Sequence, residues 1–150
     1  MEFNLLRHEH FNVDHCHDCM VPGYLIVSPV TPVSSLATLS TEAQRDLGSI
    51  LTAATSAIIN VIAPIKIYCA LFGEDHQHVH FHLFPRTTST TAEFLEVFPE
   101  QRNQIHGPVL LDWARSRYRA SNEDVWRLAS GTINALQSEF ATVPKTFSKP

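Results

Sequence analysis

Three histidines, His78, His80 and His82, alternate with apolar residues between positions 78 and 84. Imidazole titrates near neutral pH, so it can act as a nucleophile, an acid or a base under physiological conditions. Successive side chains of a β-strand point to opposite faces, so a strand over 78–84 places the three imidazoles on one face, about 6.6 Å apart. A row of three titratable groups in register indicates a functional site rather than packing.

Such a row suits attack on a phosphorus atom. A neutral ring nitrogen that attacks phosphorus forms a phosphoramidate, which divides one difficult displacement into two easier ones. The second nitrogen of that ring must be held by a hydrogen bond, which fixes the tautomer. Flanking imidazoles can donate hydrogen bonds to the phosphate oxygens. The row therefore places a nucleophile between two donors, and this chemistry requires no metal.

Cys16 and Cys19 have the Cys-x-x-Cys spacing of half a zinc site. Four histidines surround the pair in sequence and offer further ligands: His8, His10, His15 and His17. Three interpretations stay open for the two cysteines, namely structural zinc binding, support of a ligand pocket, and simple packing.

Length, charge and cysteine content limit the class of protein. The 150 residues are enough for one domain with a core, and the net charge of −4 argues against a general nucleic-acid binder. A small phosphorylated ligand needs only local donors and is compatible with that charge. We see no apolar run long enough for a bilayer and no signal-peptide pattern, and three cysteines suit a reducing compartment. We therefore expect a cytoplasmic protein that contacts no membrane.

The pattern of apolar residues predicts the strands that must position the histidines. Strands are predicted over 11–13 and 24–28, and the nearly continuous apolar run over 65–72 predicts a central strand. Cys69, within that run, is expected to be buried. The five polar residues that follow predict a hairpin, so the histidine strand should be antiparallel to 65–72.

A long helix is predicted between the second and third strands. Ser40 or Thr41 can cap it, Glu42 suits its first turn, and Pro64 ends it. Its apolar stripe follows spacings of three and four. The stripe comprises Ala43, Leu47, Ile50, Leu51, Ala54, Ile58, Val61 and Ile62.

The C-terminal part is predicted to be helical over 108–141. The hydroxyl-rich tract 87–91 is predicted to be a loop, and 92–107 has no clear pattern. Pro108 at a first helical position favours a helix over 107–118. Ser121 can cap a last helix. Its predicted apolar stripe is Val125, Leu128, Ala129, Ile133, Leu136 and Phe140.

The stretch from His78 to Phe84 resembles the signature of the histidine-triad family, His-φ-His-φ-His-φ-φ, where φ is apolar. The following Pro85 and Arg86 are similar to the ending found in the fragile-histidine-triad branch, the branch of dinucleoside polyphosphate hydrolases. The segment 21–29 resembles the family's PGHxLVxP strand. The resemblance is strongest over 11–90. It implies a single α+β domain over 1–150, with an antiparallel sheet of about five strands, a long helix after the first hairpin region, and a helical C-terminus.

The resemblance also implies an activity. The family's central histidine, here His80, is the nucleophile, and the outer two, here His78 and His82, orient it and contact phosphate. The family cleaves a nucleoside monophosphate from a polyphosphate, an amine or a related leaving group through a nucleotidyl-histidine. Gln77 and Arg86 are candidate phosphate-binding residues. We expect a nucleotide as partner, no nucleic acid polymer, no cofactor for the chemistry, Mg²⁺ with polyphosphate substrates, and a homodimer.

Some family members bind structural zinc through a cysteine pair, a histidine after the first long strand, and the first triad histidine. Here that set would be Cys16, Cys19 and His78, but Thr31 and Pro32 stand where the intermediate histidine would be. Counting back from Gly23, Cys16 instead falls near the position of the family's ribose-contacting Asn or Asp.

Two other classes of function compete with the nucleotidyl-histidine enzyme. The first is a zinc-dependent enzyme or metal-binding module that uses Cys16, Cys19 and the strand histidines, because His-x-His on a strand can chelate zinc. The second is a nucleotide-binding module without turnover.

Overall fold

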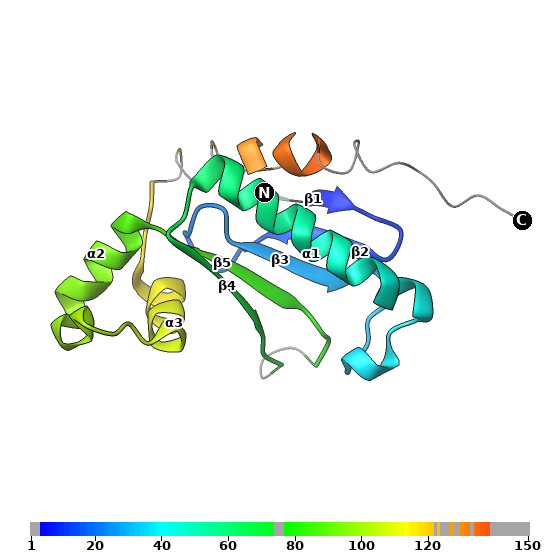
Figure 1. Cartoon of the computed structure of the whole chain (residues 1–150), viewed down its shortest axis with the longest axis horizontal. Coiled ribbons are helices and arrows are strands. Elements are labelled where there is room, and N and C mark those ends of the chain that lie inside the picture. The colour runs from blue at the N-terminus through cyan, green and yellow to red at the C-terminus, as the bar shows by residue number, and fades with distance from the viewer. Residues whose placement is uncertain are drawn as a thin grey trace, which may run out of the picture.

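The computed structural model describes residues 4–73, 77–121, 123, 127, 130–132 and 134–138. Five strands form one antiparallel sheet in the order β1-β2-β3-β5-β4, shown in Figure 1. Their bounds are β1 Asn4–Arg7, β2 Phe11–His15, β3 Leu25–Pro29, β4 Lys66–Leu71 and β5 Phe81–Arg86. The α+β class and the five-stranded sheet are as the sequence predicts. The sequence pattern did not predict the strand β1, however.

One face of the sheet is covered by the long helix α1 (Thr41–Ile62), which lies across the strands in Figure 1. The hydroxyl of Ser40 caps the helix by accepting a hydrogen bond from the N–H of Ala43. A short 3₁₀ helix, η1 (Leu36–Thr38), precedes it. Apolar residues of α1 and of the strands β2, β3 and β5 form one core cluster between them. The predicted helix is therefore confirmed, and every residue of its predicted stripe except Val61 contributes to this cluster.

Among the described residues, the opposite face is covered only in part, by α2 (Thr88–Val97), η2 (Pro99–Arg102) and α3 (Gly107–Arg117). Figure 1 shows both α-helices gathered at one end of the sheet. A second cluster joins them to Tyr24 of the β2–β3 connection and to Phe84 of β5. The rest of this face, where β5 begins, stays accessible to a ligand.

The prediction of a loop over 87–91 is wrong, because Thr87 caps α2 and the residues after it are helical. The Thr87 hydroxyl accepts a hydrogen bond from the N–H of Thr90, and the Thr91 hydroxyl donates to the Thr87 carbonyl. A run of hydroxyl side chains resembles a loop in composition, yet threonine is also a favoured N-cap. The tract therefore begins a helix.

The prediction that 65–72 is a central strand is also wrong. In the part of the chain that the structure describes, β4 lies at an edge of the sheet and pairs with β5 alone. Cys69 is exposed rather than buried, and the apolar side chains of Ile65, Leu71 and Phe72 are exposed as well. A continuous apolar run is compatible with a strand that is buried on both faces. It is equally compatible with an edge strand whose apolar side chains are partly exposed.

The last predicted helix falls partly outside the described residues. The described positions 130–132 and 134–138 are helical, and Leu136 is fully buried in the core cluster under α1. The other predicted stripe residues lie outside the described part: Val125, Leu128, Ala129, Ile133 and Phe140. Within the described residues, no helix is both long enough and apolar enough to cross a membrane.

Candidate active site

One face of β5 packs in the core, and the other face borders a cavity. Phe81 and Leu83 point into the core cluster under α1, whereas Phe84 belongs to the cluster on the opposite face. His82 lines a cavity on that opposite face. The predicted alternation is therefore confirmed, and β5 is antiparallel to β4 as expected.

The strand itself begins later than predicted. β5 begins at Phe81, so His82 is the one triad histidine within it, while His78 and His80 precede it. The N–H of Val79 donates to the carbonyl of Val33, 2.8 Å away, instead of to a neighbouring strand. The side chain of Val79 is still buried in the core. Alternation thus extends beyond the regular strand.

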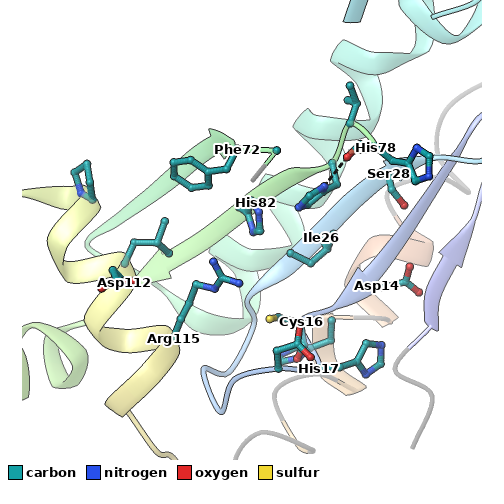
Figure 2. Close-up of a pocket in the computed structure, with 17 residues that line it drawn as sticks. Asp14, Cys16, His17, Ile26, Ser28, Phe72, His78, His82, Asp112 and Arg115 are labelled. Carbon is teal, nitrogen blue, oxygen red and sulfur yellow. Dashed lines mark hydrogen bonds between the residues drawn. The ribbon is translucent and has the colours of Figure 1, made fainter. Parts of the chain in front are cut away.

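All three histidines line one cavity of ≈ 680 Å³. This volume lies in the range of small-ligand pockets, about 300–1,000 Å³. Figure 2 shows the cavity between β5, the segment from β2 to β3, the end of β4 and one face of α3. The other lining residues are Asp14, His15, Cys16, His17, Asp18, Ile26, Ser28, Phe72, Gly73, Val79, Pro108, Leu111, Asp112 and Arg115.

The ring of His80 is held by the backbone of His78. Its Nδ1 lies 2.8 Å from the carbonyl oxygen of His78. A carbonyl only accepts hydrogen bonds, so Nδ1 carries the hydrogen and donates it. In the neutral ring the lone pair is then on Nε2. A nucleophilic imidazole needs one nitrogen held in this way, and His80 meets that requirement.

The ring of His82 packs against His80, with centroids 4.7 Å apart and planes at 68°. Its Nδ1 lies 2.7 Å from the hydroxyl of Tyr24. His82 lines the cavity, but the residue is only 5% exposed. Burial, with smaller effects from His80 and Arg115, lowers the pKa of His82 to about 4. His82 is therefore neutral at physiological pH.

Tyr24 supports His82 from the neighbouring cluster. Its side chain is fully buried and lies edge-on to Phe84, with ring centroids 5.3 Å apart. Burial raises the pKa of the Tyr24 hydroxyl, so the hydroxyl keeps its hydrogen. Tyr24 was assigned to a predicted strand only. A tyrosine within an apolar run gives no sequence signal for a role beside an active site.

Arg115 is a cavity residue that sequence reasoning missed. Figure 2 shows its guanidinium extending from α3 toward the space between His82 and Cys16. Pro108, Leu111 and Asp112 of the same helix also line the cavity, at helical spacings of three and four. That spacing was present in the sequence. The sequence does not indicate that this face of α3 packs beside the histidines.

The cysteine pair lies at the edge of the cavity. Both side chains are buried, their sulfurs are 3.2 Å apart, and Cys16 lines the cavity. The hydrogen bond between the two sulfurs, followed by burial, raises the pKa of Cys19, while the same hydrogen bond lowers the pKa of Cys16. In this contact the thiol of Cys19 donates and the sulfur of Cys16 accepts. Cys16 lines the cavity, and both cysteines also pack within the second core cluster, so pocket support and packing are both compatible with the structure.

The expected zinc ligands do not fit a common ion. Within the described part of the chain, Cys16, Cys19 and His78 do not form a group whose ligand atoms lie within 4.8 Å of one another. His15 is one of the two histidines adjacent to Cys16 in sequence, and both of its ring nitrogens have backbone partners. Its Nδ1 donates to the carbonyl of Cys16 over 3.0 Å, and its Nε2 accepts from the N–H of Gly23 over 2.9 Å.

The two candidate phosphate-binding residues lie elsewhere. Gln77 is exposed and is not among the residues that line the cavity. Arg86 ends β5, opposite Lys66 in the register with β4, whereas His82 is opposite Ala70. Arg86 therefore lies at the other end of the strand from the histidines, and Arg115 is the arginine that the fold brings to them.

Comparison with solved structures identifies the fold. A HIT-like protein involved in cell-cycle regulation from Bartonella henselae superposes with a TM-score of 0.59 at 15% identity, over 90% of this chain and 87% of the other. A hypothetical histidine triad nucleotide-binding protein from Sulfolobus tokodaii gives a TM-score of 0.64 at 10% identity, over 99% and 93%. Plasmodium falciparum diadenosine triphosphate hydrolase, in complex with cyclomarin A, gives 0.53 at 12% identity, over 97% and 79%.

No family model matches the sequence, and no curated protein matches it. The structural likeness nevertheless agrees with the motif from His78 to Phe84. The chain therefore has the histidine-triad fold, and the recognition based on the motif is confirmed at the level of the fold.

Proposed function

We propose that this protein is a nucleotide hydrolase or transferase that forms a covalent nucleotidyl intermediate on His80. The hydrogen bond from His80 Nδ1 to the His78 carbonyl carries this proposal, because it leaves the Nε2 lone pair of the neutral ring as the nucleophile. The location of that ring in a cavity of ≈ 680 Å³ gives a nucleotide room to reach it. Structural neighbours described as a nucleotide-binding protein and a diadenosine triphosphate hydrolase support the same class.

The proposed reaction has two displacements. First, His80 Nε2 attacks the phosphorus of the nucleoside monophosphate unit, a phosphorus–nitrogen bond forms, and the bond to the leaving group breaks. The leaving group departs with its bonding electron pair and takes up a proton. Second, water attacks the same phosphorus, the phosphorus–nitrogen bond breaks, and the mononucleotide is released. A proton from the attacking water passes to solvent or base, and His80 regains its neutral form.

Two groups are suited to hold the phosphate during both steps. In the tautomer in which the Tyr24 hydroxyl donates to His82 Nδ1, the Nε2–H of His82 is a donor for a phosphate oxygen. Arg115 supplies a guanidinium at the same cavity. A charge-assisted pair of donors stabilises the negative charge carried by the transferred phosphoryl group. Positive charge here is compatible with the overall charge of −4, because it is local.

The remaining walls fit the nucleoside. Ile26 and Phe72 offer apolar surface, and the Phe72 ring lies 5.6 Å from the His82 ring between centroids. Asp14 and Asp18 add carboxylates that can accept hydrogen bonds from ribose hydroxyls. We propose that Mg²⁺ enters the site only as a complex with a polyphosphate substrate. The chemistry at His80 uses no metal.

Substitution of His80 tests the proposal. We expect His80→Gly to reduce hydrolysis of a dinucleoside polyphosphate and of a nucleoside phosphoramidate by about three orders of magnitude or more, because the nucleophile is lost. Binding of the mononucleotide, measured by calorimetry, should persist. His106→Ala is the matched control, since this histidine is exposed and does not line the cavity. Near-normal turnover by folded His80→Gly would remove His80 from the mechanism.

A further inference from the structure

A second group of polar side chains lies outside the cavity, between the β1–β2 hairpin and α1. It consists of His8, His10 and Asp46, whose potential ligand atoms all lie within 4.8 Å of one another. None of the three lines the histidine-triad cavity. We propose that these three residues bind a zinc ion, which would link the hairpin to the helix. This inference is independent of the proposed function.

The donor set fits zinc. Imidazole nitrogen and carboxylate oxygen are both common zinc ligands, and three protein ligands with a water complete a tetrahedral site. With bonds of about 2.0–2.1 Å, tetrahedral ligand atoms lie about 3.3 Å apart. The distances from Asp46 Oδ2 bracket that value, at 2.6 Å to His10 Nδ1 and 4.0 Å to His8 Nδ1. Small side-chain rotations would therefore suffice to form the site.

The backbone holds the potential ligands near one another. The N–H of His10 donates to His8 Nδ1 over 3.3 Å, and zinc bound at this nitrogen would replace that hydrogen bond. The hairpin is closed by the N–H of His8, which donates to the Phe11 carbonyl over 2.8 Å. Asp46 is held in the first half of α1, after the Ser40 cap. Two rigid elements, 36 residues apart in sequence, thus present ligands to one point.

The site is accessible to an ion. The side chains of His8, His10 and Asp46 keep 28%, 23% and 38% of their surface exposed. On binding, zinc would replace the hydrogen bond between His10 Nδ1 and Asp46 Oδ2. Neutral His10 would carry its hydrogen on Nε2 and turn the Nδ1 lone pair to the metal. The ion would neutralise the carboxylate and connect β1, β2 and α1, so binding should stabilise the fold.

Cobalt(II) titration tests the proposal, because cobalt reports the ligand type in its absorption spectrum. We expect the wild type to bind one ion at this site with visible d–d bands and no sulfur-to-cobalt charge transfer from it. Asp46→Asn and His10→Ala should each weaken this binding by more than about tenfold. His106→Ala, which alters an exposed histidine elsewhere, should bind as the wild type does. Zinc should raise the melting temperature of the wild type and of His106→Ala but not of Asp46→Asn.

Two results would overturn the site. One is unchanged cobalt affinity in both Asp46→Asn and His10→Ala. The other is a spectrum in which thiolate charge transfer accounts for all bound cobalt, which would assign the metal to the cysteine pair. Denaturant unfolding without metal shows whether each variant is folded. Should either fail to fold, His8→Gln provides the same comparison, and wild-type affinity in that variant would count against the proposal.

Discussion

The histidines around the cavity differ in what their ring nitrogens contact. His15 uses both nitrogens to hold its own strand to the turn at Gly23. His82 uses Nδ1 with the Tyr24 hydroxyl, and His80 uses Nδ1 with a carbonyl at the triad. These partners distinguish a structural histidine from the proposed phosphate donor and the proposed nucleophile. Residue type and spacing identify the triad in the sequence, but hydrogen-bond partners come only from the fold.

Arg115 should contribute to catalysis rather than to stability. We expect Arg115→Gln to lower kcat/KM by about 10- to 100-fold, because a hydrogen bond to a charged group is worth about 1.5–3 kcal/mol. Steady-state kinetics with a dinucleoside polyphosphate measures the effect. Arg117→Gln is the control, since Arg117 is exposed on the same helix and does not line the cavity. Equal kcat/KM in the two variants would exclude Arg115 from phosphate binding.

At the scale of the element, β5 shows how far a sequence pattern reaches. The period of two predicted which side chains enter the core, and Val79, Phe81 and Leu83 all do so. The pattern did not reveal where the strand begins, because that depends on the partner of the Val79 N–H, which is Val33. It also could not show that β4 is an edge strand. Sheet order follows from pairing between distant segments, and those pairings leave no local signal.

The two faces of β5 should differ in their contribution to stability. Phe81 packs in the core under α1, and Phe81→Ala should cost about 3–5 kcal/mol, including the cavity that it leaves. His82→Ala removes the contact with Tyr24 at the cavity and should cost less, about 1–3 kcal/mol. Denaturant titration gives both free energies of unfolding. A greater loss from His82→Ala would mean that the faces of the strand are assigned in reverse.

At the scale of the whole molecule, the site depends on how the layers are arranged. α1 packs across one face of the sheet and forms the main core with it. Among the described helices, α2 and α3 cover one end of the other face (Figure 1). The histidines lie beside the boundary of that partial cover, where α3 brings Arg115 to them. Helical spacing predicted α3 from the sequence, but its docking on the sheet depends on long-range packing. Arg115 was missed for that reason.

The edge strand β4 bears on the expected homodimer. β4 and its flanks expose Ile65, Leu71 and Phe72 at an edge of the sheet. We propose that this edge pairs with a second copy, as the family resemblance implies. An exposed apolar edge otherwise favours aggregation, so a specific partner would explain why it persists.

Chelation should leave the chemistry at His80 intact. The proposed zinc site at His8, His10 and Asp46 is separate from the cavity, and the proposed nucleophile is an imidazole alone. We therefore expect phosphoramidase activity to continue in EDTA. A phosphoramidate substrate is the right choice because polyphosphates bind Mg²⁺ themselves. Complete loss of activity in EDTA, reversed by added metal and with the fold retained, would favour a metalloenzyme instead.

Detection of the covalent intermediate tests the proposed mechanism most directly. Wild-type protein mixed with a dinucleoside polyphosphate, quenched in alkaline denaturant during turnover and measured as intact protein, should gain the mass of one nucleoside monophosphate minus water. Peptide mapping should place this mass on His80, and folded His80→Gly should show none. An adduct on another residue, or sustained turnover by His80→Gly without an adduct, would contradict nucleophilic attack by His80.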